Sequence, residues 1–433
     1  MKMKKKLDGG LKKIIIFFLF FIFSLKSSYS SQILDYETED FISEIIEDII
    51  EVNKINKKIK FKIINNNDIN AFVDINNVIH INSGLIIYCY DYVALLSVLA
   101  HEVGHIDLNH ITLRKKTLEN SKKYNTLGLL SVIAGSTLTQ NPQFLQGSIV
   151  TAAALSNQYI VFSKDQEMEA DLYALKTLNL LKTNSKSVQK LLDTIQEKLL
   201  NRGFTKNKQR IGTHPYFEDR ILLIENFKDN KQYNINNNYN EKFHYIKAKF
   251  VGYSDNEEVL RELNEPFKTY ADSIKKARNG NLKMSLQSLN KIIKENNNAF
   301  LLETKADILF SYGYTNEAIK FYKKNLEDYP LNFYAQIRIF ENIEIESLSN
   351  IETEKSFQNN KNLLYNYFNN KNVLLKYIKL AKKLNKKEWL QLFKLILSID
   401  DIEKEVFEIE IKNFKNTKNK DLLKLINIIE SII

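Results

Sequence analysis

The spacing of apolar and polar positions near the N-terminal end of the chain predicts a helix followed by a small sheet. Between residues 40 and 51 the apolar residues recur every three to four positions, which is the period of an amphipathic helix. The segments 60–64, 71–75 and 78–82 are short and rich in Ile, Val and Phe, as expected of strands. Asn76-Asn77 favours a hairpin turn between the last two of them. We therefore expect a small antiparallel sheet beside helices, an α+β arrangement.

The next apolar segment, 93–99, predicts a second helix, for which Asp91 is a suitable N-cap. This helix leads into a His-Glu-x-x-His motif formed by His101, Glu102 and His105. Residues four apart lie on one face of a helix, so the two imidazoles can bind one zinc ion. Glu102 is offset around the helix and can reach a water on that ion as a general base. The alternative is a pair of structural histidines on an ordinary helix.

Three other residues near this helix are assigned no role in the chemistry. His110 lies nine residues after His101 and five after His105, a spacing that turns it well away from their face, so we do not expect it to bind the metal. His80 is expected to be a strand residue. Cys89 is the single cysteine of the chain, so it forms no intramolecular disulfide and is expected to be a small buried apolar residue.

A zinc site with an open position needs a third protein ligand, and an acidic helix at 163–178 offers candidates. Glu167 and Asp171 lie four apart on one helical face, and Ala170 is small enough for close helix contact. We expect Glu167 to bind the metal and Asp171 to orient a ligand histidine. Glu169 is the competing candidate but faces another direction. A solvated acidic helix face is the alternative interpretation.

The motifs HEVGH and EMEAD, at 101–105 and 167–171, resemble those of the CAAX prenyl protease and heat-shock membrane protease group of zinc metallopeptidases. The resemblance implies a zincin-like protease fold. It implies zinc ligation by His101, His105 and Glu167, with Glu102 as the catalytic base. The segment 127–162, rich in small and apolar residues, predicts a mobile hairpin over the cleft, with ordinary helix packing as the alternative.

A third element, Thr213-His214-Pro215 followed by Arg220, resembles the H-P-x-x-x-x-R-I segment of the same group. The resemblance implies that His214 lies near the zinc, as a reversible fourth ligand or as a donor to the transition state. It also implies that Arg220 supports the site. A histidine held beside a proline can stabilise a developing oxyanion. The alternatives are a helix start with proline at its first position and a surface arginine.

The N-terminal 30 residues have the order of a secretory signal peptide: lysines, then a short apolar segment, then Ser28-Tyr29-Ser30 as a cleavage site. An uncleaved anchor is the alternative. This segment holds seven lysines and one aspartate, so its removal lowers the net charge from +10 to about +4. The basic character is therefore no indication of nucleic-acid binding. We expect no membrane-spanning helix after residue 30.

The chain contains few Gly and Pro residues, 12 and 4 in 433, which favours helices throughout. From about residue 267 onward it predicts helical repeats. The segments 270–298 and 300–331 correspond with a shift of 33 residues, and the second fits a tetratricopeptide pattern. We expect a signal peptide at 1–30, a protease domain at 31–262 and a repeat solenoid at 263–433. A plain helical bundle is the alternative for the last part.

An export signal, a zinc protease region and a C-terminal repeat array together resemble the periplasmic β-barrel assembly-enhancing proteases. The resemblance implies a periplasmic metalloendopeptidase, with one zinc ion per chain, that hydrolyses misfolded or stalled outer-membrane proteins. It further implies a chaperone-like role and contacts with the barrel-assembly machinery through the repeats. The alternative function is a repeat-based periplasmic binding scaffold with a latent zinc site.

Overall fold

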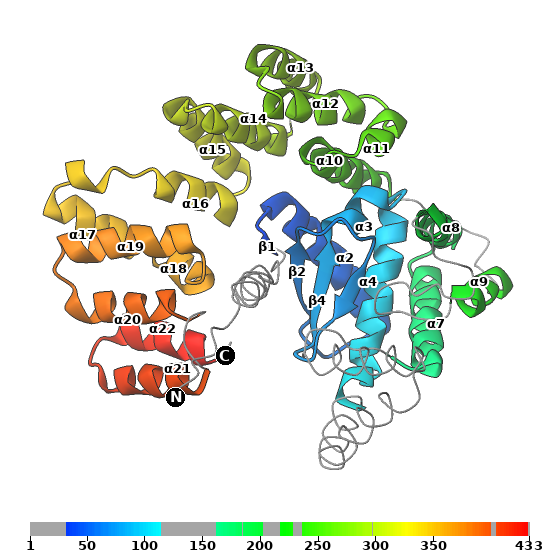
Figure 1. Cartoon of the computed structure of the whole chain (residues 1–433), viewed down its shortest axis with the longest axis horizontal. Helices are drawn as coiled ribbons and strands as arrows, with labels where there is room; N and C mark the ends of the chain where they lie inside the picture. The colour runs from blue at the N-terminus through cyan, green and yellow to red at the C-terminus, as the bar shows by residue number, and fades with distance from the viewer. Residues whose placement is uncertain are drawn as a thin grey trace, which may run out of the picture.

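The described residues are mainly helical and include a four-stranded sheet near the N-terminal end (Figure 1). The expected signal peptide, the expected hairpin except its last residue Phe162, and His214 lie outside these residues. No helix in the described ranges has both the length and the apolar character of a membrane span. The computed structural model describes residues 32–113, 162–183, 185–201, 217–227, 236–296, 298–399 and 404–431.

Helix α2 (Tyr36–Asn53) confirms the helix predicted at 40–51 and begins one turn earlier. Its N-cap is Asp35, whose side chain accepts a hydrogen bond from the Thr38 amide at 2.9 Å. The residues at the helical period, Phe41, Ile42, Ile45, Ile46 and Ile49, are all buried. The amphipathic pattern therefore places one face of α2 in the core.

The sheet is mixed, which corrects the antiparallel sheet expected from the sequence. The strand order is β1-β2-β4-β3. Strand β4 pairs antiparallel with β3, as the hairpin predicts, but it inserts beside β2 and runs parallel to it. Alternation of side chains defines a strand but not its neighbours, so the insertion was not predictable. The strands are β1 (Gln32–Ile33), β2 (Lys60–Ile64), β3 (Ala71–Val73) and β4 (Val78–Asn82).

The β3–β4 hairpin turns at the predicted Asn pair. Asn77 has a left-handed backbone, with φ of 59°, and the Asp74 side chain accepts hydrogen bonds from two amides of the turn. His80 on β4 bonds Asp74 at 2.9 Å and stacks on Phe72. The histidine is therefore a strand residue, as predicted.

Helix α4 lies at the centre of the region that carries the sequence motifs (Figure 1). It packs against α2, β3, α7 and α8, and α9 covers α7 and α8 from the far side. Cys89, at the end of α3, is fully buried, as predicted. The helices are α3 (Ser83–Tyr88), α4 (Tyr92–Asp107), α7 (Lys164–Leu180), α8 (Lys186–Asn201) and α9 (Phe217–Asn226).

The remaining helices follow one another along an arc that starts beside α4 (Figure 1). Successive helices pack mainly on their sequence neighbours, such as α12 on α13 and α14 on α15. They are α10 (Asn237–Tyr253), α11 (Glu257–Glu262), α12 (Phe267–Arg278), α13 (Leu282–Glu295), α14 (Ala299–Ser311), α15 (Thr315–Asp328), α16 (Phe333–Glu341), α17 (Asn350–Asn359), α18 (Lys361–Tyr367), α19 (Lys371–Lys383), α20 (Lys387–Leu397), α21 (Lys404–Asn413) and α22 (Lys420–Glu430).

Residues that correspond in the sequence with a shift of 33 occupy equivalent positions in successive helix pairs. Gly280 and Gly313 occupy the turns α12–α13 and α14–α15, with φ of 85° and 83°, where a side chain would be strained. Leu289 and Tyr322, also 33 apart, are both fully buried. The assignment of these helices to the tetratricopeptide class stays a prediction. So does the boundary at 262, across which one hydrophobic core is continuous.

Candidate metal centre

Helix α4 carries the His-Glu-x-x-His residues into the interior of the molecule. Its N-cap is Asp91, as predicted, which accepts a hydrogen bond from the Ala94 amide at 3.0 Å. His101, Glu102 and His105 are 4%, 1% and 0% exposed. Polar side chains buried this deeply need polar or metal partners, since burial without them costs several kcal/mol, roughly 2–7 for a neutral group.

Small residues let α4 and α7 approach each other closely. Ala170 on α7 is fully buried, and a Cβ on Gly104 of α4 would lie 3.1 Å from the Tyr173 ring. The Tyr173 hydroxyl also donates to the Asp107 carboxylate at 3.3 Å. This close contact brings the carboxylates of α7 within reach of the α4 histidines.

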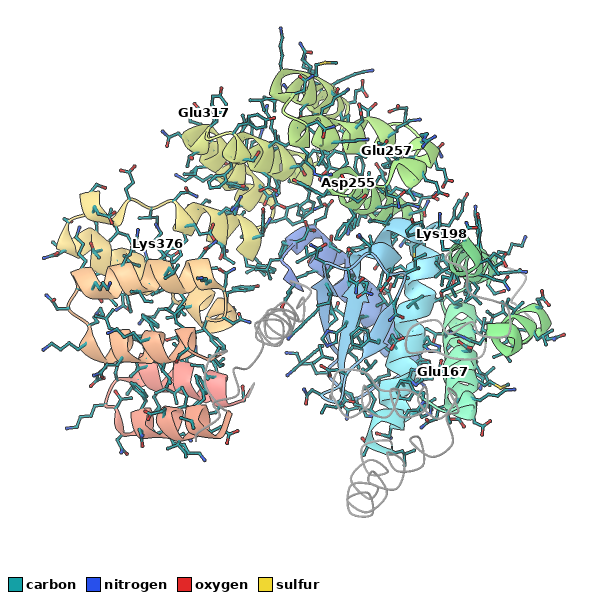
Figure 2. The ribbon with its side chains drawn as sticks, in the orientation of Figure 1. Glu167, Lys198, Asp255, Glu257, Glu317 and Lys376 are labelled. Atoms are coloured by element: carbon teal, nitrogen blue, oxygen red, sulfur yellow. The ribbon has the colours of Figure 1, made fainter. Side chains whose placement is uncertain are left out.

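Three donor atoms converge between the two helices. The Nε2 atoms of His101 and His105 are 3.1 Å apart, and the Glu167 carboxylate lies 3.5 Å from the first and 3.8 Å from the second. Figure 2 shows Glu167 on α7, beside α4. All three side chains are buried, and their ligand atoms lie within 4.8 Å of one another. The structure therefore brings together the three residues that the sequence analysis names as metal ligands.

The spacing of these atoms suits a small divalent cation. Ligand atoms about 2.0–2.1 Å from a tetrahedral zinc ion lie about 3.3 Å from each other. The two Nε2 atoms are 3.1 Å apart, and they approach different oxygens of Glu167, His101 Nε2 lying 3.5 Å from Oε2 and His105 Nε2 lying 3.8 Å from Oε1, all close to that value. Two imidazoles and one carboxylate are also the donor set of catalytic zinc sites that keep a fourth position for water.

Asp171 and Arg220 hold the first histidine in place. Asp171 Oδ1 bonds His101 Nδ1 at 2.8 Å, and Arg220 on α9 donates two hydrogen bonds of 2.7 Å to the same carboxylate. Burial alone would raise the pKa of Asp171, but the Arg220 guanidinium and the His101 ring outweigh that effect and hold the pKa below its ordinary value. Burial likewise would lower the pKa of His101, and the Asp171 carboxylate reverses that shift. Arg220 therefore acts on the site through Asp171.

The second histidine has a different support, which sequence reasoning missed. His105 Nδ1 lies 2.9 Å from His110 Nδ1, and His110 Nε2 lies 2.9 Å from Glu169 Oε2. His110 is not one of the three clustered donors, in line with its omission from the ligand set, but it turns back onto His105 rather than away from it, because α4 ends at Asp107 and Asn109 adopts a left-handed backbone, with φ of 61°. An asparagine two residues after the end of the motif helix was the available signal. Burial lowers the pKa of His110, against the raising effect of Glu169.

An apolar cavity of about 60 Å³ opens beside His101 and Glu102. The described residues that line it come mainly from α4, α7, α8 and α9, and the Asn70-Ala71 segment closes one side. Burying an unpaired charge in such surroundings is costly, so the cavity favours an apolar group over a charged one.

Comparison with known proteins agrees with this geometry. Residues 37–228 match the model of peptidase family M48. The match includes both helices of the donor cluster, so this region of the chain has the peptidase similarity that its motifs indicate.

The chain is also similar to beta-barrel assembly-enhancing proteases. It is 26% identical over 304 residues to the protein of that name from Escherichia coli strain K12, covering 66% of this chain and 61% of that protein. The protein of that name from Yersinia pestis is 25% identical over 180 residues, which cover 41% of this chain and 36% of that protein. The chain thus spans about three fifths of the length of the first of these relatives.

Proposed function

We propose that this protein is a zinc-dependent metalloendopeptidase. The observation that carries the proposal is the convergence of His101 Nε2, His105 Nε2 and the Glu167 carboxylate in one buried cluster. The match of residues 37–228 to peptidase family M48 supports hydrolysis of peptide bonds as the reaction. We assign the three residues as the ligands of one zinc ion.

The residues around the cluster take separate roles in the proposed hydrolysis. When bound, zinc supplies the Lewis acidity that polarises the scissile carbonyl and lowers the pKa of a water. Glu102 takes a proton from that water as it attacks, and passes the proton to the leaving amine. Asp171 accepts a hydrogen bond from the Nδ1–H group of His101, which keeps the Nε2 lone pair available for the metal. His214, as in the resemblance, would stabilise the developing oxyanion.

Replacement of Glu102 by glutamine tests the assigned base. We expect Glu102→Gln to keep its zinc, since Glu102 is not a ligand, and to lose hydrolysis of casein and of itself. General-base groups typically contribute about 10²–10⁴-fold to the rate, and their loss is measured by release of labelled peptides.

Two controls accompany this test: the zinc content of the Glu102→Gln protein, and inhibition of the wild-type activity by a chelator. A glutamine variant that cleaves at the wild-type rate would refute the assigned base. A wild-type protein that shows no chelator-sensitive cleavage would favour the binding scaffold with a latent zinc site.

We further propose that the enzyme acts in the periplasm on misfolded or stalled outer-membrane proteins. The names of the similar proteins from Escherichia coli and Yersinia pestis support a link to β-barrel assembly. We assign residues 1–30 as a signal peptide cleaved after Ser30, and the C-terminal helices as the contact to the barrel-assembly machinery. N-terminal sequencing of exported protein distinguishes cleavage from a retained anchor, which would show the residues of 1–30 still present.

A further inference from the structure

We propose that His110 and Glu169 form a positioning pair that fixes His105 for zinc binding through Nε2. The inference rests on the proposed zinc site and deepens it. Neither His110 nor Glu169 is among the metal ligands that the motifs predict. Together they nevertheless form a chain of contacts that ends on His105: Glu169 Oε2 lies 2.9 Å from His110 Nε2, and His110 Nδ1 lies 2.9 Å from His105 Nδ1.

The hydrogen-bond direction along this chain of contacts is set by the carboxylate at its outer end. A carboxylate accepts but does not donate, so the Nε2 of His110 carries the proton that faces Glu169. The Nδ1 of a neutral His110 then has a lone pair and accepts from His105 Nδ1. His105 consequently keeps its proton on Nδ1 and presents the Nε2 lone pair to the metal cluster.

The backbone after α4 is built to bring His110 back to this position. Asn109 takes the left-handed conformation that ends the helix, with φ of 61°. Lys57, from the loop between α2 and β2, donates to the Asn109 side chain at 3.0 Å and to the carbonyls of Ile106 and Asp107 at 2.9 and 3.2 Å. Hydrogen bonds from Lys57 therefore hold the turn that follows α4. The His110 side chain, 2% exposed, lies against His105.

Stacking restrains the remaining freedom of the His105 ring. Phe162 lies parallel to it, with ring centroids 3.7 Å apart and planes 11° apart. A hydrogen bond at Nδ1 and an aromatic ring on one face together define both the position and the rotation of the imidazole. The two ligand histidines are thus supported differently, His101 by Asp171 directly and His105 through a neutral imidazole.

The test measures zinc affinity of the purified full chain by competition with a fluorescent chelator. We expect His110→Phe, which keeps a ring but removes the acceptor, to weaken zinc binding about 10–100-fold, the usual effect of losing a partner of a ligand histidine. Glu169→Ala should weaken it about tenfold, at the low end of that range, because Glu169 is 63% exposed.

Asp165→Ala is the matched control. Asp165 is an exposed acid on the same helix, four residues before Glu169, so its removal changes the charge of α7 equally. Equal losses in Glu169→Ala and Asp165→Ala would overturn the proposal in favour of a general charge effect, and wild-type affinity in Glu169→Ala would also overturn it. Should His110→Phe fail to fold, comparison of Glu169→Ala with Asp165→Ala, both at exposed positions, still tests the proposal.

A spectroscopic measurement on the zinc-loaded wild type tests the hydrogen-bond direction itself. The chain has six histidines, so ¹⁵N-histidine labelling resolves them individually. We expect His110 to be neutral with its proton on Nε2, and a proton on its Nδ1 would overturn the proposal. A wild-type protein that binds no zinc would instead refute the proposed zinc site.

Discussion

At the scale of single residues, a buried lysine in this protein lies between two acidic side chains. The Lys249 ammonium lies 2.7 Å from the Asp35 carboxylate and 2.6 Å from that of Glu37, and all three side chains are largely buried. Burial alone would raise the pKa of Asp35, and the Lys249 charge reverses the shift. The Asp35 and Lys249 charges thus stabilise each other in place of the water that each has lost, whereas burial still raises the pKa of Glu37.

Glu39 differs, since burial and the nearby Asp35 charge raise its pKa from 4.5 to about 7. Below pH 4.5 this side chain is protonated in both the folded and the unfolded protein and costs nothing. As the pH rises towards 7 the unfolded state loses its proton first, so the free energy of unfolding falls. We expect Glu39→Gln to remove that loss and to be more stable at pH 8 by roughly 1–3 kcal/mol, after allowing for partial exposure.

Urea unfolding of the wild type and the glutamine variant at pH 4 and pH 8 measures this difference. Glu47→Gln, exposed on the same helix, is the control and should leave the urea midpoint unchanged at both pH values. A Glu39→Gln protein that is stabilised equally at both would contradict the raised pKa.

Several single-residue predictions were possible because the interaction is local in sequence. Asp91 was predicted as an N-cap, since capping involves only the next three residues. His110 was not predicted to face His105, because its position depends on a left-handed Asn109 that Lys57 holds from 52 residues away. Sequence rules that use only neighbouring residues can predict a helix cap, but they cannot predict a contact between residues far apart in the chain.

At the scale of elements, the packing of α4 on α7 decides whether the donor atoms meet. Gly104 lies at the contact, where a Cβ would be 3.1–3.2 Å from the Tyr173 side chain. We expect Gly104→Val to push the helices apart and to destabilise the protein by about 1–3 kcal/mol, the usual cost of overpacking. The same displacement moves Glu167 from the imidazoles, so zinc affinity should fall together with the unfolding temperature.

Gly104→Ala is the graded control. Its single methyl meets the same ring, but alanine gains about 0.8–1 kcal/mol in helix propensity over glycine, so we expect a net change within about 1 kcal/mol. A Gly104→Val protein with wild-type unfolding temperature and zinc affinity would contradict the role of this contact.

The type of several elements was predictable, but the order of the strands was not. The helix at 40–51 and the hairpin strands follow from periodicity and from Asn76-Asn77. The parallel pairing of β2 with β4 depends on how the whole sheet packs, which the pattern within one strand does not determine. For this reason the expected antiparallel sheet was wrong although its strands were right.

At the scale of the whole molecule, α2 connects the region that matches peptidase family M48 with the C-terminal helices. The Tyr36 ring contacts Phe300, Tyr329 and Phe333, on or beside α14, α15 and α16, at centroid separations of 5.6–6.3 Å. At its other end α2 reaches α7, where Asn53 donates to Thr177 at 2.9 Å. One helix thus contacts both the helix that carries Glu167 and the part of the C-terminal arc formed by α14 to α16.

The helical character of the C-terminal part and its 33-residue correspondence were readable from the sequence. The path of the arc was not, because each helix pair sets a small rotation that accumulates along the chain. Aromatic contacts such as Tyr36–Phe333, between residues 297 apart in sequence, have no local signal.

The measurement that tests the central claim most directly is the zinc content of the purified protein and of Glu167→Gln. Glutamine keeps the size of the side chain but lacks the anionic donor that completes the cluster with the two imidazoles. We predict one zinc ion per wild-type chain and a large loss of zinc in the variant, at unchanged helical content by circular dichroism. Equal zinc in both proteins, or none in the wild type, would contradict the account.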